Sequence, residues 1–318
     1  MDYLGLDIAK ARFDACLLTP KRHASFTNTQ AGFEQLSAWL AQHRPCTTEP
    51  LHACMEATGN WGLDLAAFLY AAGHKVSIIN PRQIKAFGES ELARNKTDKL
   101  DAALIARFCC AHQPAAWTPP VAEMRELREL VRRCAALKAH RTQELNRQKA
   151  GLASPVVAAS IERQLTHLDE EIAAITTAIR ALIERNTAVQ SNFALLRSIP
   201  GIGEITAAVI LAELPNIAEF TPKGLAAFAG LSPQEHSSGT RHSFRGISRI
   251  GNPALRSTLY LCALTARRYN TRLADFVQRM TEARKPNKVI LIALARELLV
   301  MAHAVIRTQT PFNAQPTA

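Results

Sequence analysis

Four acidic residues have the chemistry and the spacing to bind a divalent metal ion. Asp7 lies in one short apolar run, and Glu56 directly follows another. Asp98 and Asp101 are three residues apart on a predicted helix, so both project from one face. Carboxylate oxygens suit one or two Mg²⁺ ions, which can clamp the attacking and leaving oxygens of an in-line phosphoryl transfer. The spacing therefore predicts a Mg²⁺ site, although an Asp-x-x-Asp pair at a helix start is also a common partner of the helix dipole.

A serine beside a glycine supplies a candidate nucleophile. Ser238 precedes Gly239, and a phosphoryl-transfer nucleophile needs an open hydroxyl with arginine nearby to hold the phosphate. Ser237 competes for the role, and Ser243 is a more distant third candidate. Ser238 is preferred because it adjoins the glycine. The arginines that we expect to hold phosphates around it are Arg241, Arg245, Arg249 and Arg256.

A glycine-rich turn joins two apolar stretches between Ser198 and Glu204. Its sequence is S-I-P-G-I-G-E, which is typical of a helix-hairpin-helix. Gly201 and Gly203 would let backbone N–H groups approach a phosphate, because no Cβ stands in the way. A plain helical turn would use the same residues, and the pattern alone leaves both interpretations open.

The positive charge is concentrated in one segment. The chain holds 38 Lys and Arg against 27 Asp and Glu, a net charge of +11, and residues 236–296 alone hold 12 basic and 2 acidic side chains. A field of one sign attracts polyanions, of which nucleic acid is the commonest. The twelve basic residues are Arg241, Arg245, Arg249, Arg256, Arg267, Arg268, Arg272, Arg279, Arg284, Lys285, Lys288 and Arg296.

The elements that position the acids predict an α/β domain with a mixed sheet. Its strands are expected over 3–8, 12–18, 23–27, 51–55 and 75–79, and its helices over 30–43, 61–72, 81–91 and 98–112.

The rest of the chain predicts helices throughout. Apolar residues at helical spacing from 121 to 186 predict two long helices, expected to pair as a coiled-coil connector that serves as a spacer or a dimerisation arm. Residues 227–251 predict a loop between helices. The expected division is 1–115, an α/β domain; 116–190, the helical connector; and 191–318, an all-α domain with the glycine turn and the serine loop.

Length and composition exclude several classes. The chain of 318 residues, 47% hydrophobic, is too long for one small domain and too apolar to be disordered throughout. Uninterrupted apolar runs such as 289–295 are far shorter than the roughly 20 residues of a membrane span. The first residues have no signal-peptide pattern, and the seven cysteines form no C-x-x-C pair, so neither a disulfide framework nor a zinc site is expected. A cytoplasmic protein without a membrane partner is the expectation.

Seven short motifs, and the order in which they occur, resemble those of one protein family. They are G-L-D-I-A-K at 5–10, M-E-A-T-G at 55–59, I-N-P at 79–81, R-N-K-T-D-K-L-D-A at 94–102, S-I-P-G-I-G at 198–203, F-A-G-L-S-P at 228–233, and S-G with R-G-I-S-R beyond it. The full chain resembles the Piv-invertase-like DEDD transposases of bacterial insertion sequences.

The resemblance implies more than composition can. The N-terminal domain would be RuvC-like, of the RNase-H type, with the metal-binding set on Asp7, Glu56, Asp98 and Asp101. The C-terminal domain would carry the nucleophile, Ser238, which forms a phosphoserine link to DNA. A structured non-coding guide RNA would pair with donor and target DNA, and homodimers would assemble into a tetramer with shared active sites.

Two other functions stay open at this point. A RuvC-like nuclease would hydrolyse DNA with metal-activated water and would not need Ser238. A non-catalytic nucleic-acid-binding protein would use the acids only structurally and would show no Mg²⁺-dependent cleavage.

Overall fold

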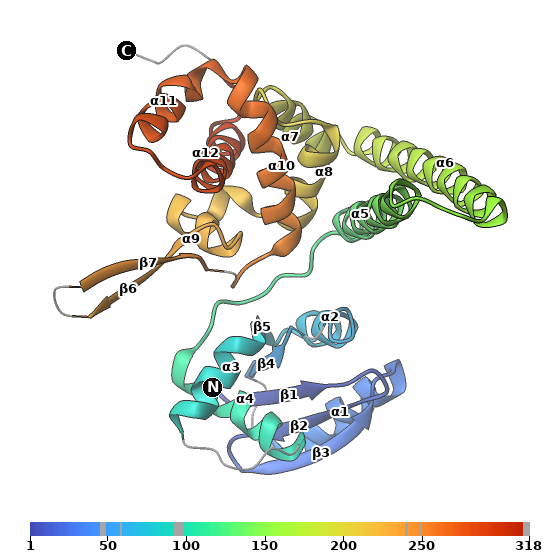
Figure 1. Ribbon diagram of the computed structural model, residues 1–318. Helices are drawn as coiled ribbons and strands as arrows, with labels where there is room; N and C mark the ends of the chain where they lie inside the picture. The colour runs from blue at the N-terminus through green and yellow to red at the C-terminus, as the bar shows by residue number, and fades with distance from the viewer. Residues whose placement is uncertain (45–48, 58, 92–97, 239–240, 249, 314–318) are drawn as a thin grey trace. The chain divides into compact units, whose positions relative to one another are not determined.

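The computed structural model describes residues 1–44, 49–57, 59–91, 98–238, 241–248 and 250–313, without the side chains of 98–100, 234–238 and 241–245. The chain forms two compact units, Met1–Pro119 and Pro120–Ala318 (Figure 1). The two long helices belong to the second unit. The division into three functional domains, with boundaries after 115 and 190, stays a prediction.

The first unit is built on a five-stranded mixed sheet in the order β3-β2-β1-β4-β5. β1 pairs antiparallel with β2 and parallel with β4, so the expected mixed α/β sheet is present. Its strands are almost wholly buried apart from β3, which alternates exposed and half-buried residues as an edge strand does. The strands are β1 Tyr3–Ile8, β2 Arg12–Leu17, β3 Arg22–Thr27, β4 His52–Glu56 and β5 Lys75–Ile79.

Helices cover both faces of this sheet. Leu4 and Leu6 of β1 pack with helices α1 (Gln30–His43) and α2 (Leu63–Ala71) on one face. On the other face, α3 (Pro81–Ser90) and α4 (Asp98–His112) enclose a second apolar cluster. The expected helices are therefore confirmed, with ends that shift by a few residues.

Gly5 allows α4 to lie unusually close to β1. A Cβ at this position would stand 2.0 Å from the carbonyl oxygen of Ala102 and 2.4 Å from the backbone nitrogen of Ala106. Any side chain here would therefore push the backbone of α4 away. Helix backbone cannot move aside as easily as the end of a flexible side chain can. Gly5 thus fixes how deeply α4, with its two aspartates, sits on the sheet.

The second unit begins with two long helices, α5 (Ala122–Lys149) and α6 (Pro155–Arg185), which lie against one another (Figure 1). Leu127 and Val131 of α5 and Ile179 and Leu182 of α6 belong to the core of the second unit, so one end of the pair is anchored there. The predicted helix pair is confirmed, while coiled-coil packing and a role in dimerisation remain predictions.

The helical core of the second unit surrounds α12 (Asn287–Thr308). Within the described residues, α12 is the one helix long and apolar enough to cross a membrane, although no uninterrupted apolar run reveals this. Leu294, Leu298 and Ala302 are fully buried, as in the core helix of a globular domain. Its neighbours are α7 (Thr187–Arg197), α8 (Glu204–Glu213), the 3₁₀ turn Ile217–Glu219, α9 (Pro222–Phe228), α10 (Pro253–Tyr269), the 3₁₀ turn Thr271–Leu273 and α11 (Ala274–Glu282).

The expected loop over 227–251 and the expected all-α C-terminal domain are wrong. The segment contains an antiparallel hairpin of β6 (Pro233–Ser238) and β7 (Arg241–Ile247). These strands lack the alternation of apolar and polar residues that marks a half-buried strand, so the sequence pattern missed them. Their backbones pair in antiparallel register, from Pro233 opposite Ile247 to Ser238 opposite Arg241.

Candidate active site

Three carboxylates share the sheet face that α4 covers. Asp7 lies two residues beyond Gly5 on β1, and Glu56 lies two residues beyond Cys54 on β4. Side chains two apart on a strand point to the same face, and Gly5 and Cys54 are register partners. Asp14 of β2 is the direct cross-strand partner of Asp7, so it shares this face as well.

The path of α4 brings its first turn toward the same end of the sheet. The end of the helix lies near the start of the strands, because Gln113 donates to the Tyr3 hydroxyl at 3.2 Å and Cys109 lies 3.5 Å from the carbonyl oxygen of His52. The middle of the helix crosses Gly5. α4 therefore runs antiparallel to β1. Its first turn, which contains Asp101, lies toward the carboxyl ends of β1 and β4.

The acids form an edge rather than a closed ligand cage. Among the side chains that the structure describes, no three of Asp7, Asp14, Glu56 and Asp101 bring their oxygens within 4.8 Å of one another. The backbone of Asp98 starts α4, but its side chain lies outside the described part. We call Asp7, Glu56, Asp98 and Asp101 the acidic edge. Its hard oxygen donors suit a divalent cation such as Mg²⁺.

Asp14 is an acid that the sequence analysis missed. It is 8% exposed and accepts a hydrogen bond from the Ser25 hydroxyl of β3. Its place in the middle of a strand gives no sequence signal, since the register that sets it opposite Asp7 appears only in the folded sheet. The bond to Ser25 fixes the position of this carboxylate.

An exposed tryptophan lies near the acidic edge. Trp61 is 49% exposed, and the ammonium of Lys10 stands 5.5 Å from its ring centroid. The Asn28 amide donates to the carbonyl oxygens of both Ala9 and Trp61, so it ties the turn after β1 to the segment after β4. An aromatic face beside an ammonium is the usual platform for stacking a nucleobase.

The hairpin places the three candidate serines at different register positions. Ser238 ends β6 and pairs with Arg241, whereas Ser237 pairs with His242 and Ser243 with His236. The side chains of these serines and of Arg241 and Arg245 lie outside the described part of the chain, as does all of Arg249. The backbone alone therefore puts Ser238 and an arginine at the end of the ribbon.

An ion pair between a buried carboxylate and a half-exposed arginine lies near the base of the hairpin. Glu213 of α8 is 4% exposed and accepts hydrogen bonds from Arg132 Nε at 2.8 Å and from Asn252 Nδ2 at 2.7 Å. Asn252 also caps α10, directly after the hairpin. Burial raises the pKa of Glu213, but the bonds from Arg132 and Asn252 and the charge of Arg128 outweigh it, so the pKa lies below its ordinary value.

Arg256 makes structural contacts at the same base. Its Nη1 atom donates to the carbonyl oxygen of Ala229 at 3.4 Å. The same nitrogen would lie 2.4 Å from a Cβ at Gly230, which has a φ of +67°. The side chain is therefore committed at least partly to holding the start of the hairpin, and its predicted phosphate contact stays a prediction.

The two glycines of the S-I-P-G-I-G turn differ in their surroundings. Gly201 has a φ of +105°, and a Cβ there would lie 2.6 Å from the Cβ of Ala266 on α10. A Cβ at Gly203, the N-cap of α8, would meet open space. Helix packing therefore accounts for Gly201, while only Gly203 has the open approach that a phosphate needs.

A cavity of about 720 Å³ lies elsewhere, against α3 and α4, but a second, of about 630 Å³, includes this glycine turn. Most of its lining is apolar, with Val131, Ile205, Val209 and Leu261 among the residues, and its polar members are Gly203 at the start of α8, Thr206, Lys138, Ser257, Thr258 and Thr265. Only the polar side of the cavity, at the N-terminus of α8 with Lys138 opposite, suits an anion.

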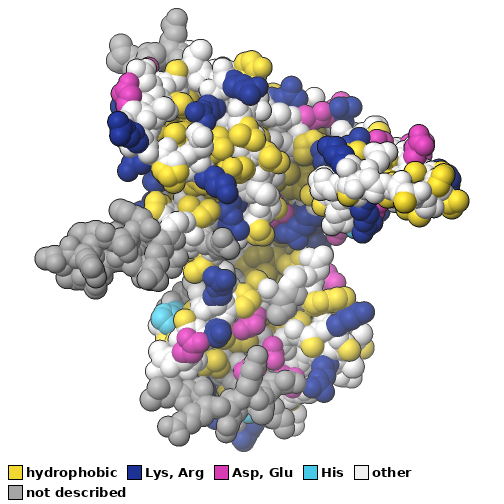
Figure 2. Space-filling view, viewed as in Figure 1, with side chains coloured by type: hydrophobic (Ala, Val, Ile, Leu, Met, Phe, Trp, Pro, Cys, Tyr) yellow, Lys and Arg dark blue, Asp and Glu magenta, His cyan; other side chains and the backbone are white. Residues whose placement is uncertain are grey.

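The basic segment is exposed on the helices of the second unit, where Figure 2 shows dark blue side chains. Arg267 and Arg272 donate to neutral acceptors, Asn287 Oδ1 at 3.2 Å and the carbonyl oxygen of Asn313 at 3.3 Å. Those bonds leave the positive charge uncompensated and available to a polyanion. The exposed members are Arg267, Arg268, Arg272, Arg279, Arg284, Lys285 and Lys288.

Comparison with known proteins identifies relatives over the whole chain. Residues 4–154 match a family described as "Transposase", and residues 193–278 match the "Transposase IS116/IS110/IS902 family". The chain is 36% identical over 317 residues to a "Pilin gene-inverting protein" of Moraxella lacunata, an alignment that covers 98% of this chain and 97% of that protein. It is 26% identical to the "Transposase for insertion sequence element IS1328" of Yersinia enterocolitica, with 98% of each chain covered.

Proposed function

The chain belongs to the IS116/IS110/IS902 family of transposases, and from that premise we propose that it is a site-specific DNA recombinase whose acidic edge and Ser238 act on the same phosphodiester. Its relatives include a protein named for inverting a gene and proteins named for transposing insertion elements. The shared chemistry of these activities is the cleavage and rejoining of DNA strands.

One structural observation supports the metal half of this proposal most directly. Asp7 and Glu56 share the sheet face that α4 covers, and Gly5 holds α4 so that Asp101 approaches their end of the sheet. The acidic edge would hold Mg²⁺. The bound ion would supply charge stabilisation to the scissile phosphate and would lower the pKa of a hydroxyl beside it.

The nucleophilic half of the proposal assigns the attack to Ser238. Its Oγ attacks the phosphorus in line, the Oγ–P bond forms, and the bond from phosphorus to one DNA oxygen breaks. The serine proton leaves to a base or to solvent, and the departing DNA oxygen takes up a proton. One phosphate ester is exchanged for another. A second DNA hydroxyl can therefore attack the phosphoserine, rejoin the DNA strand and release the serine without ATP.

Binding of the nucleic acid is assigned to three features. The exposed arginines of residues 267–284 would hold DNA or RNA backbone, and Trp61 with Lys10 would contact a base and a phosphate near the acidic edge. The open N-terminus of α8 at Gly203 would bind another phosphate. From the resemblance, we extend the proposal to a structured guide RNA that pairs with donor and target DNA, and to homodimers that assemble into a tetramer.

The test is to trap the protein–DNA adduct. Full-length protein with guide RNA, Mg²⁺ and donor DNA is quenched in denaturant, and the covalent adduct is measured. We expect it to form with wild type and with Ser237→Ala, and to be lost with Ser238→Ala. An adduct that persists in Ser238→Ala but is lost in Ser237→Ala would show that Ser237 is the nucleophile.

The nuclease alternative predicts a different product. Hydrolysis by metal-activated water would give free DNA ends, no adduct in any variant, and equal cleavage by wild type and Ser238→Ala. A non-catalytic binding protein would give neither adduct nor Mg²⁺-dependent cleavage. Either result would overturn the recombinase assignment.

A further inference from the structure

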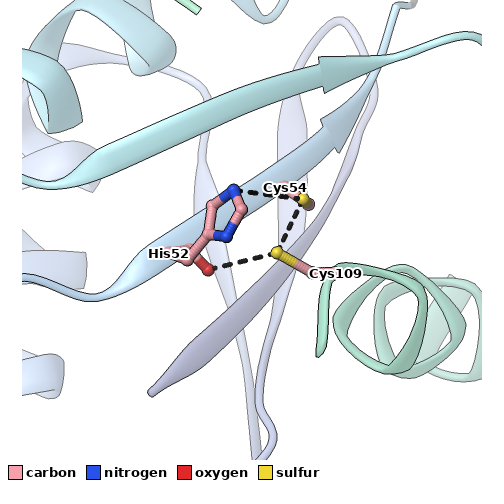
Figure 3. Close-up of side chains that lie close together, drawn as sticks. All are labelled: His52, Cys54 and Cys109. Carbon is pink, nitrogen blue, oxygen red and sulfur yellow. Dashed lines mark hydrogen bonds between the residues drawn. The ribbon is translucent and has the colours of Figure 1, made fainter. Parts of the chain in front are cut away.

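Three buried side chains with nitrogen and sulfur donors meet between β4 and α4. His52 and Cys54 lie on β4 and Cys109 on α4, and all three are fully buried. One ligand atom from each lies within 4.8 Å of the other two. Figure 3 shows the edge of the imidazole that carries its nitrogens facing the two sulfurs.

The fold itself creates this group. His52 and Cys54 are two residues apart on one strand, so they share the face covered by α4. Gly5 is the register partner of Cys54 and lets α4 approach closely. The two sulfurs are 2.7 Å apart, and Cys54 Sγ lies 4.0 Å from His52 Nε2. Cys109 is 55 residues from Cys54, so no spacing motif announces the group.

Ser77 determines which nitrogen of His52 is free. Its hydroxyl oxygen lies 2.8 Å from the carbonyl oxygen of Ala115 and 3.2 Å from that of Pro114, and both of these can only accept. The Ser77 hydroxyl therefore donates to a carbonyl, and its oxygen accepts from His52 Nε2–H, 2.8 Å away. This tautomer leaves a lone pair on Nδ1.

His52 Nδ1 has no hydrogen-bond partner in the described part of the chain, although it is buried. Leaving a buried polar atom without a partner is costly, so such atoms are rare in folded proteins. Histidine ligands of metals commonly have one nitrogen on the metal and the other donating to an oxygen held in place by a second acceptor. His52, Ser77 and Ala115 have this arrangement.

We propose that His52, Cys54 and Cys109 bind Zn²⁺ as its three protein ligands. Two thiolates and a neutral imidazole around Zn²⁺ give a complex with no net charge, which a dry interior tolerates far better than separate ions. Each thiol releases its proton to solvent when the ion enters, and two Zn–S bonds of about 2.3 Å form. The sulfurs move apart from 2.7 Å to accommodate the ion.

A disulfide between Cys54 and Cys109 is the rival outcome. Its formation would need an oxidant such as a disulfide or peroxide, and the sulfurs would close to about 2.05 Å. It would leave His52 Nδ1 without a partner, whereas zinc would satisfy it. The unpaired nitrogen is the reason that the metal is favoured.

A bound zinc ion would link β4 and α4, the strand and the helix that carry Glu56, Asp98 and Asp101 of the acidic edge. Cys54 is two residues before Glu56 on β4, and Cys109 is on the helix that begins with Asp98 and Asp101. Zinc would therefore hold the depth of α4 on the sheet without taking part in the chemistry. The site depends on none of the residues assigned to recombination, so its failure leaves that assignment untouched.

The experiment measures bound zinc in the full chain. Protein is purified with a non-thiol reductant, equilibrated with ZnSO₄ and passed over a desalting column, and its zinc content is determined by elemental analysis. We expect one zinc per chain in wild type and in Cys110→Ser, the exposed neighbour of Cys109 and a matched control. We expect none in the Cys54→Ala, Cys109→Ala double variant.

Two further measurements separate the possible outcomes. Ser77→Ala removes the partner that fixes the tautomer and should weaken zinc binding about 10–100-fold. Cobalt in place of zinc should give a thiolate charge-transfer absorption that the double variant lacks. Folded wild type without zinc, or zinc retained in the double variant, would overturn the proposal. So would an intact mass lower by two hydrogens in unreduced wild type, with Cys54 and Cys109 joined.

Discussion

The acidic edge and the serine hairpin are stabilised in opposite ways. Asp7 and Glu56 lie on central strands of a five-stranded sheet, under a helix packed against Gly5. Ser238 ends a ribbon of two strands, β6 and β7, to which no third strand is added in the described residues. A two-stranded hairpin is marginally stable by itself, so its position depends on its base and on whatever it contacts.

This difference separates two tasks within one proposed reaction. A metal site needs fixed ligands, because an ion is held well only where the geometry exists beforehand. A serine that must attack DNA, stay covalently bound to it and then be released needs to lie on a segment that can move between these steps. Glu213 is bonded to Arg132 and to Asn252, the N-cap of the helix after the ribbon, so these contacts lie near its base and not at its end.

The largest expected effect comes from the acidic edge. Glu56→Gln removes a proposed metal ligand while keeping the size of the side chain, so recombination should fall about 100- to 1,000-fold with little change in melting temperature. Asp14→Asn is the matched control on the same sheet face and should retain activity within several-fold. Activity is measured by quantitative PCR of recombined product. Equal losses in both variants would contradict the distinction between the strand-end acids and Asp14.

The base of the hairpin should be the most sensitive part of the second unit. Glu213→Ala removes the buried acceptor of Arg132 and Asn252 and should lower the free energy of unfolding by about 1–3 kcal/mol. Urea denaturation followed by circular dichroism measures the change. Lys85→Ala removes an exposed ion pair with Glu89 and should change stability by less than about 1 kcal/mol. A Glu213→Ala effect as small as that of Lys85→Ala would mean that the hairpin has no such anchor.

The glycine turn separates packing from phosphate binding. Gly201→Ala forces a side chain toward Ala266 at a positive φ and should destabilise the protein by about 1–3 kcal/mol. Gly203→Ala should leave stability within about 1 kcal/mol but weaken DNA binding, measured by fluorescence anisotropy at fixed salt. The opposite pattern would show that Gly201, rather than Gly203, is the phosphate contact.

The acid dependence of stability should be the smallest effect. The folded-state pKa of Glu213 is lowered, so its contribution is fully present above the unfolded pKa of about 4.3 and is lost as the pH falls through the folded value. Wild type should therefore lose more stability than Glu213→Gln between pH 6 and pH 3. Identical acid profiles of the two proteins would remove the ion pair from this account.

Sequence alone predicted the first unit well, since buried strands such as Tyr3–Ile8 and His52–Glu56 are short apolar runs. It also predicted the helices that follow them, because their caps and apolar spacing are local features. It missed the hairpin at Pro233–Ile247 because the segment lacks the alternation of apolar and polar residues that predicts a strand. Register and backbone pairing are properties of the fold.

The sequence predicted the candidate site only where its residues are close to one another in the chain. Asp98 and Asp101 share a helix face, which spacing reveals. Asp14 stands opposite Asp7 only through strand register, and Cys109 reaches Cys54 only because Gly5 admits α4. The absence of a C-x-x-C pair therefore gave no information about a metal group assembled in space.

The most direct test asks whether the serine needs the acids. Asp7→Asn protein is incubated with guide RNA, Mg²⁺ and donor DNA, and the phosphoserine peptide is quantified by mass spectrometry. If both act on one phosphodiester, the Ser238 adduct should fall at least about 100-fold from the wild-type yield while the protein stays folded and bound to DNA. A wild-type yield of Ser238 adduct in Asp7→Asn would show that hydroxyl and carboxylates serve separate steps, which contradicts the account.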